Sequence, residues 1–315
     1  MLAKVVPMEL EFIRWLQSRI PPHRYVPVGI GDDAAVLALS ENGKMVVTTD
    51  MLMDGVDFEL SFATAQRVGR KALAVNLSDL AAMAARPRAA VIALALPRDG
   101  GRSLAEELYR GLLELAAEFD VAIAGGDTNS WDGPLVVSIT ALGEVTQRGP
   151  LLRSGARPGD EILVTGSFGG SILGKHFDFI PRVREALSWH ENFELHACID
   201  VSDGLSLDLA RVADASGCGA VIDFAQVPIS QDAERLAELR NDGVSALEHA
   251  LADGEDFELI LAAPAGELPK ILSAASTSVP VTSIGHFIDR PGLWQLRLDG
   301  AEEPVIPRGY QHDFR

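Results

Sequence analysis

The sequence predicts an α/β protein of two domains, each of which mixes helices with strands. Three observations lead to this prediction: a length of 315 residues, a globular composition, and apolar segments of both helical and strand type along the whole chain. With 47% hydrophobic and 23% charged residues, each half can build its own core. A polar, glycine-containing turn over 153–160 indicates a junction, so we predict domains at 1–150 and 151–315.

The first half is predicted to hold three helices and four strands. The helices are expected over 9–20, 64–85 and 103–119, and the strands over 45–49, 91–96, 121–124 and 135–142. Pro21 and Pro22 end the first helix. The second helix is so rich in Ala, Leu and Val that most of it must be buried.

In the second half, strands are expected over 161–165, 220–224 and 257–262, with a helix over 205–215. Gly169–Lys175 has the G-x-x-x-x-G-K spacing of a phosphate-binding loop, but His176 stands where that loop needs Ser or Thr. We therefore interpret these glycines as sites of close helix–strand packing. No spacing of Cys and His suits zinc.

The excess of acidic over basic residues argues against some classes of binding partner. There are 27 basic against 45 acidic residues, a formal charge of -18, which argues against nucleic-acid and anionic membrane partners. The apolar run 89–97 is too short to span a bilayer. With no signal peptide and two cysteines, Cys198 and Cys218, we expect a cytoplasmic protein whose thiols are core residues.

Aspartates recur at strand ends, in glycine turns and within the buried helix. The clusters are Gly29–Val36, Thr48–Asp50, Asn76–Asp79, Gly125–Thr128 and Ile199–Leu205. Some have ordinary structural explanations, since Asp203 could cap the helix at 205–215 and Asp33 could form an Asx turn. Asp79 is harder to explain, because a carboxylate on a buried helix is costly unless it is paired or metal-bound. Lys71 lies about 12 Å away along that helix and is a poor partner.

Together these acids indicate a hard cation. Carboxylates beside Thr and Ser hydroxyls, without Cys or His, are ligands typical of magnesium. Several acids in one cleft would repel one another without a cation, and clustered magnesium usually serves a polyphosphate. The residues therefore predict ATP-dependent chemistry and leave the acceptor open.

The ordered motifs resemble the thiamine-monophosphate kinase family over nearly the whole chain. The matching segments are GIGDDAAV (29–36), TTDMLMDGVDF (48–58), KALAVNLSDLAAMAA (71–85), GGDT (125–128), RSGARPGDEILVTG (153–166), IDVSDGLSLDL (199–209), GEDFEL (254–259) and GYQH (309–312). The resemblance implies an N-terminal mixed-sheet domain that pairs in a homodimer, a C-terminal α/β domain, and ATP in a cleft near the dimer interface.

The resemblance also implies roles for individual residues. The implied magnesium ligands are Asp33, Thr48, Thr49, Asp50, Asp79 and Asp127, with Asp200 and Asp203 from the second domain. The implied ATP contacts are Tyr109, Gly126, Asp127, Arg153 and Ser202, and the implied contacts to thiamine monophosphate are Asp57, Glu255 and Tyr310. No covalent nucleophile or general base is expected. The attacking phosphate, with a second pKa near ~6, is already largely ionised at neutral pH, so metals and alignment suffice for in-line transfer from ATP.

Two departures from the family pattern bear on the acceptor. Asp57 stands where the family usually has His, and an ionised Asp cannot donate a hydrogen bond to a phosphate. Asn129–Asp132 replaces the usual Thr-Arg-Gly, which removes a cation. Two alternatives therefore stay open. One is a sister ATP-dependent synthetase, although the reactive Cys of the selenophosphate enzyme and the terminal Cys of the hydrogenase-maturation protein are missing. The other is a non-catalytic nucleotide-binding homologue.

Overall fold

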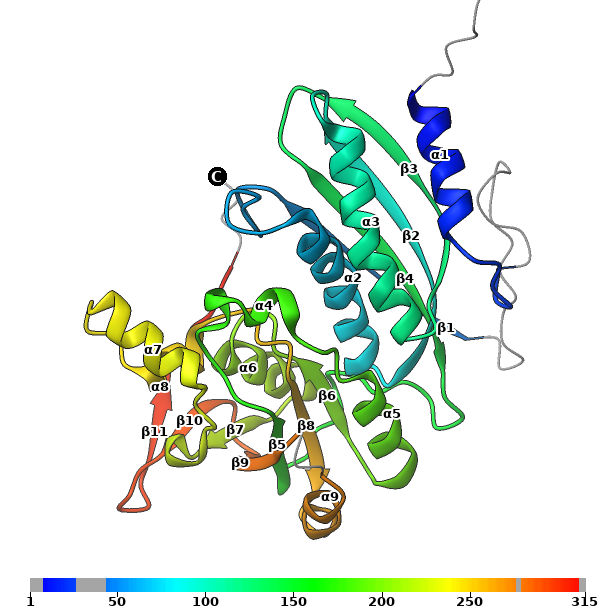
Figure 1. The fold of residues 1–315 in the computed structure, drawn as a ribbon. Helices are drawn as coiled ribbons and strands as arrows, with labels where there is room; N and C mark the ends of the chain where they lie inside the picture. The colour runs from blue at the N-terminus through cyan, green and yellow to red at the C-terminus, as the bar shows by residue number, and fades with distance from the viewer. Residues whose placement is uncertain (1–7, 27–43, 276–278, 312–315) are drawn as a thin grey trace, which may run out of the picture. The chain divides into compact units, whose positions relative to one another are not determined.

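The computed structural model describes residues 8–26, 44–275 and 279–311, and the chain divides into two compact units (Figure 1). Unit 1 comprises Met1–Leu80 and Ala85–Gln147, and unit 2 comprises Ala81–Ala84 and Arg148–Arg315. Both units mix helices with strands, so the predicted fold class is confirmed. Within the described residues, no helix is both long and apolar enough to cross a bilayer.

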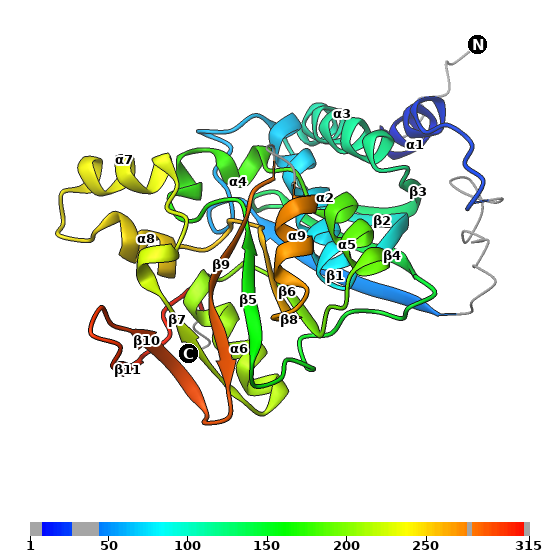
Figure 2. The same ribbon diagram turned by 90° about the horizontal axis from the view of Figure 1, so that it is seen from below.

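Unit 1 is a four-stranded mixed sheet with helices on one face (Figures 1 and 2). Its elements are α1 (Met8–Arg19), β1 (Met45–Met53), α2 (Ala65–Ala82), β2 (Ala85–Pro97), α3 (Gly101–Glu118), β3 (Ala122–Trp131) and β4 (Val136–Val145). The strand order is β1-β4-β2-β3. The pairs β1–β4 and β2–β4 are antiparallel, and β2–β3 is parallel. Helices α2 and α3 cover one face, which we call the covered face, and the opposite one is the open face.

Two glycines let α2 and α3 approach closely. A Cβ added at Gly69 would lie 1.9 Å from the carbonyl oxygen of Leu108, and one added at Gly111 would lie 1.8 Å from that of Gln66. Since both neighbours are backbone atoms, no side-chain movement could relieve the clash. The close approach fixes α2, which carries Asp79, over the sheet.

Side chains of β1 alternate between the two faces of the sheet. Val46 and Leu52 are buried on the covered face, whereas Val47 and Met51 are 61% and 60% exposed on the open face. Val91 of β2 is also exposed on the open face. Among the described residues of unit 1, none covers these apolar side chains of the open face.

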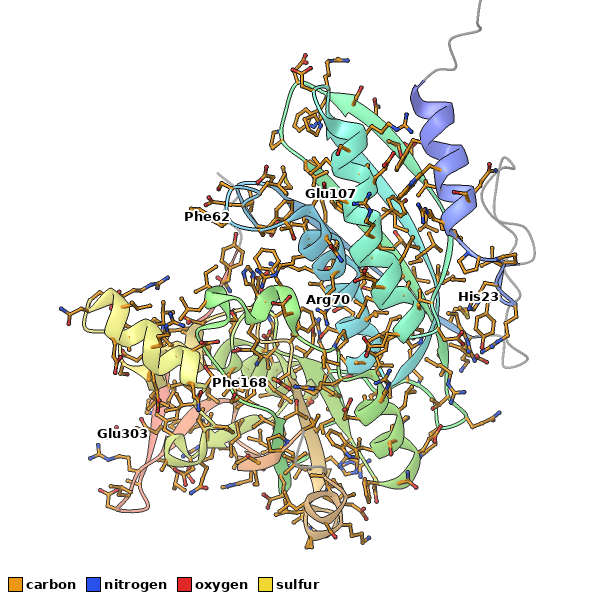
Figure 3. All side chains as sticks on the ribbon, viewed as in Figure 1. His23, Phe62, Arg70, Glu107, Phe168 and Glu303 are labelled. Carbon is orange, nitrogen blue, oxygen red and sulfur yellow. The ribbon has the colours of Figure 1, made fainter. Side chains whose placement is uncertain are left out.

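Unit 2 contains a seven-stranded mixed sheet in the order β11-β10-β7-β9-β5-β8-β6. Its strands are β5 (Asp160–Thr165), β6 (Ala197–Asp200), β7 (Gly219–Ile222), β8 (Leu259–Pro264), β9 (Val281–Ile288), β10 (Gly292–Leu296) and β11 (Glu302–Val305). Its helices are α4 (Lys175–Asp178), α5 (Val183–Asn192), α6 (Leu205–Ser216), α7 (Gln231–Arg240), α8 (Ala246–Ala252) and α9 (Leu268–Ala274), with 3-10 turns η1 (Ser171–Leu173) and η2 (Phe224–Gln226). The core includes the fully buried rings of Phe168 and Phe287 (Figure 3 labels Phe168).

Most predicted elements are present, but their ends differ in instructive ways. β1 and β3 run past the predicted ends at 49 and 124, so Asp50 and Gly125–Thr128 lie inside strands instead of after them, and Thr48 and Thr49 lie in mid-strand instead of at a strand end. Polar residues can lie within these strands because the hydrogen bonds between neighbouring strands are made by backbone groups, whichever side chains the strand carries. Conversely, β8 begins at Leu259 and not at 257, because Phe257 has a left-handed backbone (φ 51°). Cys198 and Cys218 are free and buried, as predicted.

Candidate active site

Two of the predicted acids meet beneath α2 in unit 1. Asp50 lies in the middle of β1, on the covered face with Thr48, and Asp79 lies in the last turns of α2. The Thr48 hydroxyl donates a short hydrogen bond to Oδ2 of Asp79. This bond joins β1 to α2 across 31 positions of sequence. Three oxygen-bearing side chains therefore converge between the sheet and the helix.

Asp50 is the electrostatically perturbed member of this group. Burial, together with the charges of Asp79 and Asp57, raises the pKa of Asp50 to about 7. Its Oδ2 atom is buried and has no hydrogen-bond partner among the described residues. A buried carboxylate oxygen without a donor is costly. A cation bound at this position would remove that cost.

Asn76, one turn before Asp79 on α2, was assigned no role from sequence. It is fully buried, and its Nδ2 donates to the carbonyl of Ala72 at 3.0 Å. Its Oδ1 has no hydrogen-bond partner within the described part of the chain. Positions three apart share one face of a helix, so the Asn76-x-x-Asp79 spacing presents an amide oxygen and a carboxylate on the same side of α2.

These oxygen ligands suit a magnesium ion that is held partly by waters and substrate phosphates. They are too few to hold a metal ion without such additional ligands. Across residues 8–26, 44–275 and 279–311, no three His, Cys, Asp or Glu side chains form a ready-made metal site. Magnesium, however, is commonly held by one or two carboxylates together with waters and substrate phosphates. Asp50, Asp79 and the Thr48 hydroxyl are of that type. The predicted ligand Asp33 lies outside the described residues.

Thr49 does not join this group, because successive strand residues face opposite ways. Its hydroxyl lies on the open face, where it donates to the carbonyl of Ile139 and accepts from the Thr140 hydroxyl, both at 3.1 Å. The structure thus separates the Thr49 side chain from Asp50 and Asp79.

Asp57 holds the turn that follows β1. Its Oδ2 accepts from the backbone N–H of Met53 at 2.7 Å, and its carbonyl oxygen accepts from Nζ of Lys71 at 2.8 Å. The carboxylate is also close enough to raise the pKa of Asp50. The residue predicted to contact the acceptor thus has a structural role and an electrostatic effect on the acidic group.

Asp127 and Gly126 lie at the far edge of the sheet. β4 and β2 separate β1 from β3, which places Asp127 about 14 Å from Asp50 at roughly 4.8 Å per strand. Asp127 pairs with Ala93, an open-face position, and is exposed. The expectation that Asp50, Asp79 and Asp127 gather around one ion is therefore not met within a single chain.

Tyr109 is a core residue of α3. Only 3% of it is exposed, and its ring packs edge-on against Phe12 and Trp15 of α1 at centroid distances of 5.8 and 6.5 Å. Burial raises the pKa of its hydroxyl. Since α1 covers the ring, the structure does not open Tyr109 to a nucleotide, and packing explains its position.

In unit 2 one loop brings together four of the predicted residues. After β6, the carbonyl of Ser202 accepts from the N–H of Glu255 at 2.7 Å, and the carbonyl of Asp203 accepts from the N–H of Tyr310 at 2.8 Å. A Cβ at Gly309 would lie 2.4 Å from the Asp203 carbonyl oxygen, so only glycine lets this segment approach so closely. Tyr310 is 50% exposed. Residues about fifty and a hundred positions apart thus meet at this loop.

Asp203 does not cap α6, which corrects one structural explanation given above. The N-cap position is Gly204, without a side-chain hydrogen bond, whereas Asp203 Oδ2 accepts from Arg211 Nη1 at 2.5 Å.

Two further predicted residues of unit 2 differ in exposure. Asp200, at the end of β6, is 3% exposed. Arg153 lies exposed in the segment before β5, with its carbonyl accepting from Ser216 at 3.3 Å.

A buried charged network under the 254–259 segment was missed by sequence reasoning. Glu258 receives two hydrogen bonds of 2.7 Å from Arg182, and Lys175 lies 3.3 Å from Glu258 and 3.6 Å from Asp256. Burial would raise the pKa of Glu258, but Arg182 and Lys175 bring it below its ordinary value. Burial raises the pKa of Asp256 to about 7. The available signal was the three acids of GEDFEL, which directly precede the apolar strand β8.

Lys175 also settles the interpretation of the G-x-x-x-x-G-K segment. Its Nζ donates to the carbonyl of Ser167 at 2.8 Å, in addition to its two acidic neighbours. A Cβ at Gly169 or Gly170 would lie within 2.6 Å of the backbone of α8 or α7. Gly169 and Gly170 therefore allow close packing, but of a loop against two helices and not of a helix against a strand as predicted, and Lys175 belongs to an internal network of hydrogen bonds and charges.

Comparison with known proteins identifies the family. Residues 31–145 match the AIR synthase related protein N-terminal domain, and residues 157–293 match the corresponding C-terminal domain. The thiamine-monophosphate kinase of Rhodopirellula baltica is 45% identical over 312 residues, which cover 97% of each chain. The chain belongs to the thiamine-monophosphate kinase family. The Escherichia coli K12 enzyme of this name is 36% identical, over 91% of this chain and 92% of its own.

Solved structures of thiamine-monophosphate kinases have the same fold. That of Stenotrophomonas maltophilia K279a is 35% identical, with a TM-score of 0.78 over 94% of this chain and 97% of its own. AaThiL complexed with AMPPCP and TMP is 26% identical, with a TM-score of 0.75 over 97% and 96% of the chains. The hydrogenase maturation protein HypE of E. coli reaches a TM-score of 0.79 at 18% identity, a likeness of fold alone.

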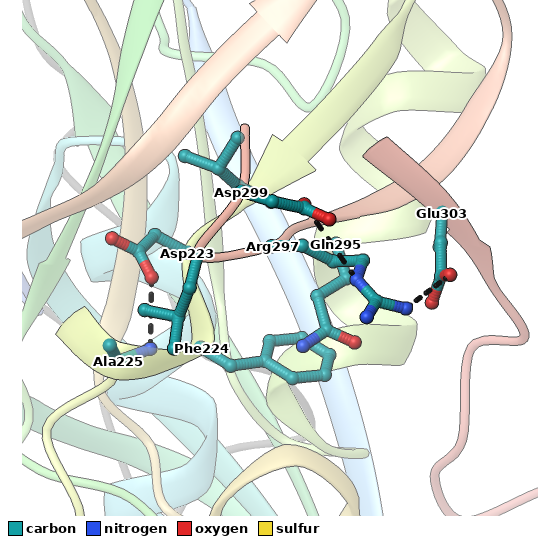
Figure 4. A pocket seen from close by; sticks show the side chains of 9 residues that line it. Asp223, Phe224, Ala225, Gln295, Arg297, Asp299 and Glu303 are labelled. Carbon is teal, nitrogen blue, oxygen red and sulfur yellow. Dashed lines mark hydrogen bonds and ion pairs between the residues drawn. The ribbon is translucent and has the colours of Figure 1, made fainter. Parts of the chain in front are cut away.

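A shallow pocket of about 530 Å³ lies elsewhere in unit 2 (Figure 4). It opens where β7 and β10 end, and Arg297 crosses it to reach Glu303 at 2.5 Å. β9, β5 and β8 separate β7 from β6, so the pocket is remote from the Ser202 loop of this kinase-family chain. Its lining, as far as the chain is described, contains no residue implied by the family resemblance.

Proposed function

We propose that this chain transfers the terminal phosphoryl group of ATP to the phosphate of thiamine monophosphate, giving thiamine diphosphate. The observation that carries the proposal is full-length similarity to thiamine-monophosphate kinases, up to 45% identity over 97% of the chain among the relatives named above. AaThiL, a solved relative, was complexed with AMPPCP and TMP. The acidic group of unit 1 and the Ser202 loop of unit 2 supply side chains suited to these ligands.

Asp50, Asp79 and Thr48 are the residues that would hold magnesium. The buried Oδ2 of Asp50 and the Thr48–Asp79 hydrogen bond support this assignment. Magnesium bound here would neutralise phosphate charge that develops during transfer. The chain's own contribution is to hold these oxygens rigidly between β1 and α2, so that no reorganisation is needed at the moment of reaction.

Glu255 and Tyr310 are the residues that would bind the acceptor. Thiamine carries a cationic thiazolium ring, which a carboxylate attracts and an aromatic ring can stack upon. Both residues are anchored through their backbones to one loop, which fixes the spacing between the carboxylate and the ring. With no nucleophile required, alignment of two phosphates is the main task of the protein.

The open face of unit 1 would pair with a second copy of the chain. Exposed Val47, Met51 and Val91 on that face favour burial against another apolar surface. Asp127 also lies on the open face, too far from Asp50 to share an ion with it in one chain. Because Asp50 faces the covered side of the sheet and Asp127 the open side, we assign Asp127 to a part of the active site that a second copy completes, separate from the ion at Asp50.

The direct test is incubation of the purified chain with ATP, magnesium and thiamine monophosphate, followed by chromatographic detection of thiamine diphosphate. We expect diphosphate formation that stops when EDTA is added and in Asp79→Asn. Binding of ATP without transfer to thiamine monophosphate would favour the non-catalytic alternative. Release of ADP that depends on a different acceptor would favour a sister synthetase.

A further inference from the structure

The Glu255 segment is held in a conformation that ordinary residues avoid. Glu255 has φ 64° and Phe257 has φ 51°, both in the left-handed region, where L-residues with a side chain are disfavoured. Such backbone persists only where the surroundings over-determine it, and it is concentrated at functional sites. The two positions lie on either side of the buried Asp256.

Four independent contacts hold this backbone in place. The N–H groups of Glu255 and Phe257 donate to the carbonyls of Ser202 and Val201 at 2.7 and 2.8 Å. Asp256 Oδ2 accepts from the N–H of Gly169 at 2.8 Å. The Phe257 ring stacks on Phe179 at 4.2 Å between centroids. The segment therefore presents the Glu255 side chain from a rigid base.

The remaining freedom of Glu255 lies in its side chain, and His176 restricts it. His176 Nδ1 lies 3.0 Å from Glu255 Oε2. The imidazole is 5% exposed and the Glu255 side chain 30% exposed, so the contact approaches from the protein side of the carboxylate. The imidazole itself is fixed against the ring of Phe177, 4.0 Å away between centroids.

We propose that His176 is a positioning residue for acceptor binding. It holds one oxygen of Glu255 so that the carboxylate faces the cationic ring of the acceptor. The inference rests on the proposed function, because Glu255 must face a cationic acceptor for its orientation to matter. His176 itself touches neither ATP nor the transferred phosphoryl group in this scheme, so its effect should appear in acceptor binding and not in nucleotide binding.

The test compares His176→Ala and His176→Asn with wild type, since the Asn amide can replace the Nδ1 contact. His190→Asn is the matched control, because His190 is equally buried but bonds the carbonyl of Gly149, at 2.9 Å and away from the loop. We expect His176→Ala to raise KM for thiamine monophosphate ~10- to 100-fold, the size of a lost hydrogen bond to a charged group. The KM for ATP should stay within about twofold, and His176→Asn should recover most of the loss.

A double-mutant cycle with Glu255→Gln separates positioning from general damage. If His176 acts through Glu255, His176→Ala should add little further loss in the Glu255→Gln background. An unchanged KM for thiamine monophosphate in His176→Ala, or an equal rise in both KM values, overturns the proposal while leaving the kinase assignment intact. Absence of diphosphate formation by wild type overturns both.

Discussion

Arg211 of α6 lies against the buried carboxylate of Asp208, with 2.6 Å between Nη1 and Oδ1. Asp208 is fully buried. Burial raises the pKa of its carboxyl, while the N–H of Asp203 and the charge of Arg211 act in the opposite direction. The same guanidinium contacts Asp203, so it also fixes the loop that gathers Ser202, Glu255 and Tyr310.

Replacing Arg211, whose side chain is 35% exposed, by Met should therefore destabilise the protein by about 2 kcal/mol, because the fully buried carboxylate of Asp208 loses its charged hydrogen-bond partner. Urea unfolding followed by circular dichroism would measure the loss. Arg297→Met is the control, since Arg297 pairs with Glu303 at the surface, where such a pair contributes less than about 1 kcal/mol. Equal losses in the two variants would contradict a special role for Arg211. Adding Asp208→Asn to Arg211→Met should restore part of the stability.

Asp50→Asn should abolish phosphorylation yet stabilise the metal-free protein at neutral pH. The folded-state pKa of Asp50, about 7, lies above the ordinary value of 3.8, so ionising it opposes folding. Its contribution to stability is complete below pH ~4 and is lost as the pH rises through 7. In EDTA, the Tm of wild type should fall between pH 5 and pH 8 more than that of Asp50→Asn. Asp132→Asn, at an exposed position paired with Arg98, should behave like wild type. If the Tm of Asp50→Asn fell with pH as much as that of wild type, ionisation of Asp50 would not be the cause of the pH dependence.

Mixing two inactive variants tests whether Asp127 acts across a dimer. Asp50→Asn and Asp127→Asn should each be inactive alone. If one copy supplies Asp50 and the other Asp127, mixed dimers regain one intact site, and an equal mixture should recover about a quarter of wild-type activity. Unmixed variants taken through the same subunit exchange are the control. No recovery, with exchange verified by differently tagged chains, would place both aspartates in the same chain's site.

Gly69→Ala should destabilise unit 1 severely. The new Cβ would lie 1.9 Å from the Leu108 carbonyl oxygen, so α2 and α3 must move apart, at a cost of about 3 kcal/mol or more. Because α2 carries Asp79, activity should fall together with stability. Gly266→Ala is the matched control, as its Cβ would meet no atom within 4 Å. Chemical denaturation of both variants would measure the difference, and similar midpoints would show that the helices can yield.

The sequence by itself determined the alternation of helices and strands, the apolar character of α2, the core positions of the two cysteines and the dismissal of the phosphate-loop pattern. These follow from local periodicity and residue chemistry, which need only neighbouring positions. The family resemblance rested on the order of motifs and needed no coordinates either.

Only the tertiary structure decided which oxygens share a site. It placed Thr48 and Asp50 on one face of β1 and Thr49 on the other, set Asp127 three strands away, and packed Tyr109 beneath α1. It also joined His176 to Glu255 across 79 positions of sequence. Such contacts depend on strand register and on how closely helices approach, which are set by packing between segments far apart in the chain. Composition and spacing therefore identify the candidate chemical groups, whereas tertiary packing determines which of these groups are in contact.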